Sequence, residues 1–432
     1  MPQRNLRLHR PVIPVLIGVL IILQIFAPAP PILYLLCVLL GVSGISYYWA
    51  IQLRDNLDLE RERRYGWAQV GDVIEERFSL SNAAGLPLLW AEVRDHSSLP
   101  GYTAMRVIAV SARGQTRWNT EGFCSRRGVF TLGPLSIHTS DPFGPFSVQI
   151  EHTYLESFTV YPSVSSLPRI ELPRGVSGGA SRANYPTHRL TTDAASVRQY
   201  VPGDALNRIH WRSTARHGAI HVKEFDIRPS GDLWLILDLE RAVQLGEGEQ
   251  STEEYAVILA ASLAYRVLQE NRAVGLIGFS GYRAMVRPAR GQTQLWHILR
   301  TLANVTAEGD WPLDKILRQV APTLGRGLTA AVITSSPDPT WLAGMLLLRH
   351  YGIAPMAILL DRASFGGEGD ARTMAGLLAE QGIPSHIISR GHRFFPLMPR
   401  RRQRPIYKVL ATGRVLVIPP EQASARDMAG EV

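Results

Sequence analysis

Residues 232–239 read Asp-Leu-Trp-Leu-Ile-Leu-Asp-Leu, an apolar run with an aspartate at its start and another near its end. A run of this kind, without alternation of polar and apolar residues, is typical of a strand buried on both faces of a parallel sheet. Asp238 then stands where that strand ends. We therefore take residues 232–239 as the first strand of an α/β domain that begins at residue 231.

Strand and helix patterns alternate from there to residue 389. The expected strands are 273–279, 282–288 (a hairpin arm), 328–334, 353–360 and 384–389, and the expected helices are 252–270, 292–304, 312–320, 339–350 and 369–381. This order predicts a doubly wound α/β sheet, in a domain that we extend over residues 231–420. Ligands of such sheets bind beyond the carboxyl ends of the strands.

Residues 198–216 contain the densest cluster of functional side chains in the chain: Arg-Gln-Tyr-Val-Pro-Gly-Asp-Ala-Leu-Asn-Arg-Ile-His-Trp-Arg-Ser-Thr-Ala-Arg. Pro202-Gly203 predicts a turn, and Asp204 follows at the place of a helix N-cap. A helix of about a dozen residues from there would align three arginines on one face. The candidate contact residues of this motif are Arg198, Tyr200, Pro202, Gly203, Asp204, Arg208, His210, Trp211, Arg212 and Arg216.

This motif has two interpretations. The stripe of Arg208, Arg212 and Arg216 could meet an acidic surface on a partner, or it could be held within the chain by residues such as Asp204 and Glu224. Ile209 and Trp211 flank the stripe, and burial of both would favour the second interpretation, in which the helix fixes how two domains sit together.

The order Arg-x-Tyr-x-Pro-Gly-Asp followed by His-Trp-Arg-x-x-Ala-Arg resembles the signature of the domain of unknown function 58 family, also called YeaD-like proteins. A second match runs from Arg126-Arg127-Gly128 to Gly133-Pro134 and continues with Asp141-Pro142-Phe143-Gly144-Pro145-Phe146. The resemblance covers about residues 60–420. It implies a small β domain followed by a von Willebrand A-like α/β domain.

Von Willebrand A domains hold a metal ion at an Asp-x-Ser-x-Ser loop after the first strand. The matching residues here are Asp238-Leu239-Glu240-Arg241-Ala242, in which both hydroxyl positions are lost. Thr293 is the candidate for the threonine of a later loop, and Ser335-Ser336-Pro337-Asp338 stands where a second aspartate is expected. Mg²⁺ requires near-octahedral oxygen ligands, so we expect no metal and no other cofactor at these degenerate positions.

The composition suits a folded protein of several domains: 432 residues, 46% of them hydrophobic, with a formal net charge of +9. The only lysines are Lys223, Lys315 and Lys408, so nearly all of the 46 basic residues are arginine. Arginine favours acidic partners or lipid head groups, although a GC-rich genome would produce the same surplus. Two cysteines, Cys37 and Cys124, supply neither a disulfide framework nor a zinc site, and we expect both to be small buried side chains.

Residues 12–27 and 28–51 carry no charge and are separated by Pro28-Ala29-Pro30-Pro31. Two transmembrane helices within a membrane anchor over residues 1–54 explain this length most simply, although a cleaved signal peptide over residues 1–27 is an alternative. The turn between the spans has no basic residue, whereas arginines precede the first span and follow the second: Arg4, Arg7, Arg10, Arg54, Arg61, Arg63 and Arg64. The positive-inside rule then predicts a multi-pass protein of the bacterial inner membrane with its soluble domains in the cytoplasm.

Residues 66–162 predict an all-β module, a sandwich or small barrel. Short runs between turn signals suggest seven strands: 73–80, 88–94, 105–110, 129–132, 135–139, 147–150 and 157–161. We expect Arg126 and Arg127 at a solvated hairpin tip, and Phe143 and Phe146 folded back on the sheet. Residues 163–230 form a linker that ends in the Arg-rich signature motif.

No enzyme signature is present: there is no Gly-x-Ser-x-Gly, no phosphate-binding loop and no His-Glu-x-x-His. Asp204, His210 and Ser213 do not suggest a catalytic relay on a helix, and Cys124 with His138 is an equally weak thiol pair. We therefore expect a non-enzymatic, membrane-anchored adaptor or scaffold. The resemblance implies MoxR-type AAA+ ATPases and other von Willebrand A-domain proteins as partners, in envelope-related or complex-assembly processes. The alternative is an anion-binding module that contacts lipid head groups or nucleic acid through the Arg-rich motif, although nucleic acid is not an expected partner because no nucleic-acid-binding fold is visible.

Overall fold

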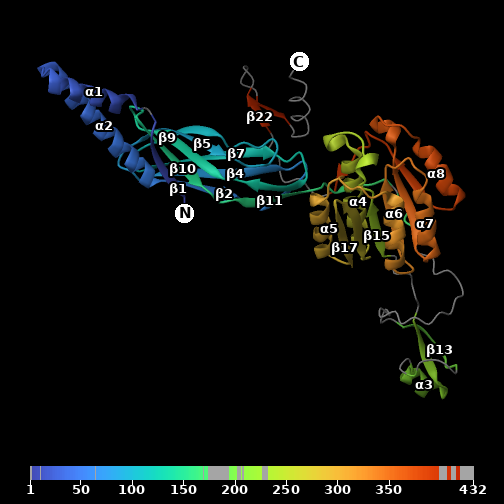
Figure 1. The fold of residues 1–432 in the computed structure, drawn as a ribbon. Helices are drawn as coiled ribbons and strands as arrows, with labels where there is room; N and C mark the ends of the chain where they lie inside the picture. The colour runs from blue at the N-terminus through green and yellow to red at the C-terminus, as the bar shows by residue number, and fades with distance from the viewer. Residues whose placement is uncertain are drawn as a thin grey trace. The chain divides into compact units, whose positions relative to one another are not determined.

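The computed structural model describes residues 2–9, 11–63, 65–168, 170–173, 194–201, 206, 209–225, 232–397, 406–409 and 415–418 (Figure 1). The chain divides into two compact units, Met1–Ser163 with Pro396–Val432, and Val164–Phe395. Each unit is described here by itself.

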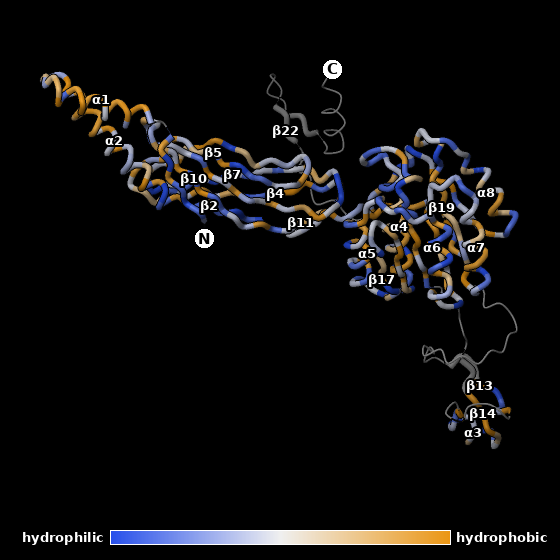
Figure 2. Tube along the Cα trace, in the orientation of Figure 1, coloured by the Kyte–Doolittle hydropathy of each residue, from blue (hydrophilic) through white to orange (hydrophobic). Residues whose placement is uncertain are grey.

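The first unit begins with two apolar helices, α1 (Val12–Phe26) and α2 (Pro30–Asn56), which pack against each other. Hydrophobic residues run along both helices (Figure 2). In the part of the chain that the structure describes, α2 alone is long and apolar enough to cross a membrane, and α1 is a shorter apolar helix. A membrane anchor and a signal sequence both fit that length and composition.

An all-β module forms the rest of the first unit. Its strands are β1 (Gln3–Leu8), β2 (Leu57–Arg63), β3 (Trp67–Gln69), β4 (Val73–Asn82), β5 (Leu88–Asp95), β6 (Arg106–Val110), β7 (Gly114–Phe123), β8 (Gly128–Leu132), β9 (Leu135–Ser140), β10 (Phe146–His152) and β11 (Glu156–Tyr161). They form three sheets, in the orders β1-β10-β9-β5-β6, β2-β4-β7 and β3-β11-β8. Alternate residues of each strand point into one hydrophobic core, as the two-residue period of a strand requires.

The module contains strands that the sequence patterns did not predict. β1 lies before the apolar segment and pairs antiparallel with β10, while β2 follows α2 directly and pairs with β4. Both ends of the helix pair therefore continue into strands of the same module. The division into an anchor over residues 1–54 and a β module from residue 66 is wrong for residues 3–8 and 57–63.

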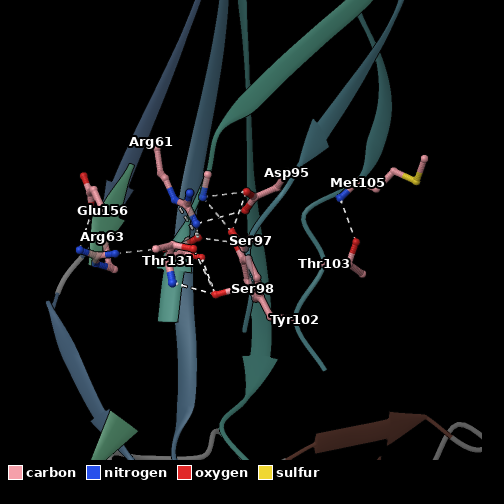
Figure 3. A network of polar contacts seen from close by, with 12 residues as sticks. Arg61, Arg63, Asp95, Ser97, Ser98, Tyr102, Thr103, Met105, Thr131 and Glu156 are labelled. Atoms are coloured by element: carbon pink, nitrogen blue, oxygen red, sulfur yellow. Dashed lines mark hydrogen bonds and ion pairs between the residues drawn. The ribbon is translucent and has the colours of Figure 1, made fainter. Parts of the chain in front are cut away.

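β2 was missed because its inward positions include a charge. Arg61 points into the module, where its Nε donates to Glu76 at 3.0 Å and its guanidinium lies 3.2 Å from Asp95. The Tyr102 hydroxyl also donates to Glu76, and Arg63 pairs with Glu156 at 2.5 Å (Figure 3). The carboxylates of Glu76 and Asp95 are fully buried, so this network compensates charges that would otherwise be costly to desolvate.

Two further expectations for the module need correction. Arg127 is 5% exposed rather than solvated at a hairpin tip, and Phe143 is 54% exposed rather than folded onto the sheet. Phe146 does pack against the core, and Cys124 is buried, whereas Cys37 is exposed on α2.

The second unit contains a six-stranded α/β sheet. Its strands are β15 (Leu233–Leu237), β16 (Val274–Ser280), β17 (Tyr282–Ala289), β18 (Thr329–Thr334), β19 (Ala354–Leu360) and β20 (Ser385–Ile388), and its helices are α4 (Thr252–Gln269), α5 (Gln292–Asn304), α6 (Leu313–Val320), α7 (Trp341–His350) and α8 (Ala371–Glu380). The strand order is β17-β16-β15-β18-β19-β20, with β17 antiparallel and the others parallel. Helices cover both faces (Figure 1). The predicted doubly wound arrangement is thus confirmed as a mixed, mainly parallel sheet.

All five residues of β15 are buried, as the uninterrupted apolar run predicted. The chain moves from β15 to β16 on one side, and later to β18 on the other side. The carboxyl ends of β15 and β18 therefore form the point where the strand order reverses, which is where open α/β sheets bind ligands.

The signature motif lies on a separate small element of β13 (Ala194–Gln199), α3 (Trp211–His217) and β14 (His221–Phe225), with β13 and β14 antiparallel. The remaining short strands are β12 (Ser165–Ser166), β21 (Phe395–Pro396), β22 (Ile406–Val409) and β23 (Val415–Ile418). The basic stretch Arg400–Arg404 lies outside the described residues.

Candidate functional site

Asp238 lies at the carboxyl end of β15 and is 1% exposed. The Thr334 hydroxyl, at the end of β18, donates to its Oδ2 at 2.6 Å, and the Glu240 N–H donates to its Oδ1 at 3.2 Å. Burial raises the pKa of Asp238 to about 6, although both hydrogen bonds favour the charged form. The side chain is therefore a buried, fully hydrogen-bonded carboxylate that titrates close to neutral pH.

Arg362 follows β19 on the same edge of the sheet and reaches back toward these loops. Its Nη1 donates to the carbonyl of Val243 at 2.6 Å and to that of Ser335 at 3.3 Å, and its Nε donates to the carbonyl of Glu368 at 3.0 Å. No carboxylate among the described residues pairs with Arg362, and burial lowers the pKa of its guanidinium. The hydrogen bonds of this guanidinium thus all go to neutral carbonyl oxygens.

A small pocket of about 30 Å³ opens beside Arg362. It is lined by residues of β18, β19 and the start of α8, among them Ser335, Ser336, Leu360, Arg362 and Asp370. Asp370 is the N-cap of α8, because its carboxylate accepts the Arg372 N–H at 2.9 Å. One buried water occupies about 10–15 Å³ on this measure, so the pocket has room for a group the size of a carboxylate.

In the signature motif, the structure places the helix later than predicted. α3 begins at Trp211, and His210 caps it by accepting the Ser213 N–H at Nδ1, 3.3 Å away. Ile209 is extended, because it forms a β-bridge with Val222. The expected helix of a dozen residues after Asp204 is therefore wrong, and α3 has seven residues. Pro202, Gly203, Asp204 and Arg208 lie outside the described residues.

Arg212 and Arg216 share one face of α3 and are exposed. Trp211 beside them is 70% exposed, which contradicts the expected burial, whereas Ile209 is 9% exposed. Tyr200 is half-buried and donates its N–H to the carbonyl of Ile220, and Arg198 stands opposite Val222 in β13. The stripe is reduced to two described arginines next to an exposed indole.

The geometry does not support either of the two catalytic arrangements considered above, the relay that includes His210 and Ser213 or the thiol pair of Cys124 and His138. His210 Nδ1 does lie 2.7 Å from the Ser213 hydroxyl, but the same nitrogen accepts the Ser213 N–H in the helix cap. Burial raises the pKa of Cys124 to about 12, the opposite of what a thiol nucleophile requires. His138 lies beside Trp90, with ring centroids 5.7 Å apart.

Comparison with known proteins supports the resemblance drawn from the motifs. Residues 196–332 match the family described as protein of unknown function DUF58. The match covers less than half of the chain, so the chain is similar to this family over that segment. It includes α3, β14, Asp238 and most of β18, so the signature helix and the buried aspartate belong to one family segment.

Sequence comparison also finds relatives that match part of this chain. YeaD of Bacillus subtilis (strain 168), described as uncharacterized, is 24% identical over 193 residues, which cover 45% of this chain and 46% of YeaD. An uncharacterized protein of Mycobacterium tuberculosis (strain H37Rv) is 31% identical over 167 residues, 38% of this chain and 48% of that protein. The matches thus span about half the length of these relatives. Among solved structures, the von Willebrand factor type A protein of Catenulispora acidiphila is similar to 37% of the chain at 11% identity, with a TM-score of 0.27 and 38% of that protein covered.

The donors beside the DUF58 aspartate do not fit a divalent cation. Both carboxylate oxygens of Asp238 already accept hydrogen bonds, and Ala242 offers no oxygen on its side chain. Burial, and then the charge of Asp338, raise the pKa of Glu240. No group of three potential metal-ligating side chains occurs in the described parts of the chain. The guanidinium of Arg362 is one positive charge that this end of the sheet already holds.

Thr293 lies at the opposite end of the strands, on the amino-terminal side of the sheet. β17 is antiparallel and returns the chain from Ser280 to the amino end of β16, where Ala289 stands opposite Val274, and α5 begins there. Thr334 supplies the hydroxyl to Asp238 instead. Thr334 and Arg362 were not among the predicted site residues, although Thr334 ends β18 and Arg362 follows β19, and both strands are buried.

Proposed function

We propose that this chain is a non-enzymatic, membrane-anchored adaptor, whose α/β domain docks a partner protein at the carboxyl edge of its sheet. Arg362 is the observation that carries this proposal. Its guanidinium has no acidic partner in the described part of the chain and lines a pocket of carboxylate size. Burial and fixed acceptors hold the side chain in place, so little conformational entropy is lost when a ligand binds.

The chemistry of this edge selects an acidic side chain of the partner. A carboxylate that enters the pocket would meet the Arg362 guanidinium and the Ser336 hydroxyl, whereas the Ser335 hydroxyl already donates to the carbonyl of Val243 at 2.8 Å. Charge-assisted hydrogen bonds of this type are about twice as strong as neutral ones. The edge would thus accept an acidic residue directly through a guanidinium, with no metal ion between them.

For the anchor we propose two membrane passes. β1 precedes α1 and β2 follows α2, and both strands belong to the same β module. Arg4 of β1 also donates to the carbonyls of Arg54 and Leu57 at the end of α2, at 2.5 and 3.1 Å. A helix pair whose two ends are held together enters and leaves a bilayer on the same side.

The positive-inside rule selects the side. Arginines flank the helix pair at Arg4, Arg7 and Arg54, and the connection Ala27–Ala29 between the helices has no charge. We infer that the β module and the α/β domain face the cytoplasm of a bacterial inner membrane. A reporter fused after residue 432 should be active in the cytoplasm, and a periplasmic signal would overturn the topology.

The partner class that the resemblance implies is a MoxR-type AAA+ ATPase, together with other von Willebrand A-domain proteins, in envelope-related or complex-assembly processes. The full chain in detergent should form a complex with such an ATPase from the same organism. Arg362→Gln should weaken binding at least tenfold in a titration by light scattering, while Arg300→Gln, an exposed arginine on α5, should not. Equal affinity of both variants would reject docking at this edge.

The exposed Trp211 beside Arg212 favours a second candidate function, anion binding by the signature motif. An indole next to a guanidinium provides stacking and charge for phosphate-bearing ligands. Binding to anionic lipid vesicles or to nucleic acid should then weaken steeply with salt and be lost in Arg212→Glu with Arg216→Glu. Salt-insensitive binding to a protein partner would favour the adaptor function alone.

A further inference from the structure

The turn between β9 and β10 holds an aromatic ring in solvent. Phe143 lies in this turn and is 54% exposed, whereas Asp141 at its start is 2% exposed. The Asp141 carboxylate accepts three backbone N–H groups of the turn, from Phe143 at 3.0 Å, Gly144 at 3.1 Å and Phe146 at 2.9 Å. Gly144 takes the left-handed backbone conformation that the tight turn requires, with φ 85°. Hydrogen bonds to the buried Asp141 carboxylate thus hold the turn in place. The Phe143 ring at its tip does not pack in the hydrophobic core of the module.

This turn lies at the end of the β module from which the apolar helices depart. Leu8, the last residue of β1, stands opposite Phe146, and the next N–H, of His9, donates to the carbonyl of Pro145 at 2.7 Å. α1 begins three residues later, at Val12. From the side of α2, the ring of Tyr47 contacts Phe146 with centroids 5.5 Å apart. Figure 1 shows both helices leaving the module at this end.

Exposed apolar and aromatic side chains collect at this end. Leu8 is 48% exposed and Tyr47 49%, and both neighbour Phe146, the last residue of the turn that carries Phe143. Tyr48, the next residue of α2, is 58% exposed. Arg7 is also exposed here and adds positive charge. Aromatic rings next to basic residues are typical of the boundary between head groups and acyl chains.

The length of the helices brings this patch to that boundary. Ser46, Ala50 and Leu53 of α2 are fully buried, and the last two pack in the core of the module, so only residues 30–45 project from it. At 1.5 Å per residue, this arm is about 24 Å long, and α1 is about 22 Å long. The hydrocarbon layer is about 30 Å thick, so arms of this length cross most of it only if they start at its edge. That requirement places the helix-bearing end of the module in the interfacial layer, with local thinning of the bilayer making up the remaining difference.

We propose that the Asp141–Phe146 turn is a membrane finger: Phe143, with Leu8 and Tyr47 exposed at the same end of the module, inserts into the head-group boundary of the bilayer that holds α1 and α2. The inference rests on the proposed membrane anchoring and adds a second point of attachment to it. Two attachments at one end would fix the orientation of the β module on the membrane, which two short helices alone would leave free to tilt.

The test measures depth in the bilayer at three positions of the full chain. The background is Cys37→Ala, since Cys124 is buried and its raised pKa of about 12 keeps its thiol unreactive. Single cysteines replace Phe143, Val19 in the middle of α1, and Phe123. Phe123 is the matched control, because it is an exposed phenylalanine opposite Val73, at the end of β4 away from α2. Each variant carries an environment-sensitive fluorophore and is reconstituted into vesicles of phosphatidylcholine and phosphatidylglycerol.

Lipids brominated at different depths of the acyl chain then quench each label. We expect strong quenching of the Val19 label by deep bromines, quenching of the Phe143 label by shallow bromines, and no quenching of the Phe123 label. A Phe143 label that behaves like the Phe123 label, while the Val19 label is quenched, overturns the finger and leaves the anchor intact. An unquenched Val19 label overturns the membrane anchor itself, and the finger with it.

Discussion

Replacing Asp238 with asparagine should change how the stability of the α/β domain depends on pH. The pKa of Asp238 is raised to about 6 in the folded protein by burial, from an ordinary value of about 4. Below pH 4 the Asp238 carboxyl is protonated in both the folded and the unfolded state. Folding then does not bury a charge at this position, and the stability carries no penalty from it. Between pH 4 and 6 the unfolded state loses its proton first, so the free energy of unfolding falls as the pH rises. Above pH 6 the loss is complete.

The size of this loss follows from the shift in pKa. Each unit corresponds to about 1.4 kcal/mol, so a shift of about two units makes the folded protein less stable by about 3 kcal/mol at pH 7 than at pH 4. The asparagine side chain in Asp238→Asn has nearly the same shape as aspartate but does not ionise in this pH range. Relative to the parent protein it should therefore gain about 3 kcal/mol between pH 4 and pH 7, from which about 1 kcal/mol is subtracted at every pH for the altered hydrogen bond with Thr334.

The measurement is urea unfolding of the full chain in detergent, followed by circular dichroism at several pH values between 4 and 7.5. The β module is common to both proteins, so the difference between them reports Asp238. Thr334→Val supplies a second check, because it removes a hydrogen bond to the charged form and should enlarge the loss at pH 7. A difference between Asp238→Asn and the parent protein that is the same at every pH would refute this account of the site.

Three further predictions concern packing and buried charge. Gly309→Ala places a Cβ 2.2 Å from a backbone oxygen of β16 and should lower the free energy of unfolding by about 3 kcal/mol, measured by urea unfolding, whereas Gly376→Ala on α8, with open space around it, should leave stability unchanged or raise it. Arg61→Met removes the guanidinium that lies against two fully buried carboxylates, those of Glu76 and Asp95, and should cost the β module about 3–5 kcal/mol, seen as a lower thermal midpoint. Arg318→Met breaks only an exposed pair, and an equal loss there would contradict this role of the buried charges. Leu53→Ala opens a cavity where α2 enters the core of the module and should cost about 2–5 kcal/mol, measured as faster proteolysis between α2 and β2; unchanged proteolysis would mean that α2 is not held there.

The α/β domain could be predicted well because its strands are buried on both faces. Runs such as 328–334 and 353–360 contain no charged residue, so their limits can be recognised without knowledge of the neighbouring strands, and β18 and β19 lie within a residue of them. The helices between them carry an apolar stripe, and α5 has the predicted limits, 292–304. The local pattern of apolar residues is therefore sufficient to predict the limits of such strands and helices.

The positions of the candidate site residues depend on contacts between distant parts of the chain, which cannot be read from the local sequence. Asp204 is a good N-cap by type, but the bridge between Ile209 and Val222 keeps the chain extended up to the residue where His210 starts α3. Thr293 follows a strand whose direction, set by its pairing with β16, carries it to the wrong edge. Strand direction and the position of a turn are properties of the assembled sheet.

The edge strands of the β module show the same limit. β2 reads Leu-Asp-Leu-Glu-Arg-Glu-Arg, and its inward arginine makes it look like a solvated segment. β1 lies next to an apolar helix and carries two arginines of its own, so it reads as the charged flank of a membrane segment. In both strands a charged residue has a fixed partner elsewhere in the module, and only the structure identifies that partner.

The pairing of β1 with β10 also has a consequence for biosynthesis. Gln3 pairs with Glu151, so the first strand leaves the ribosome nearly 150 residues before its partner. At about 5–20 residues per second, β1 stays without its neighbour for roughly 7–30 s. The two apolar helices emerge within that interval, while the sheet is still incomplete. β1 can therefore pair with β10 only after both apolar helices have been synthesised, so this part of the sheet forms late.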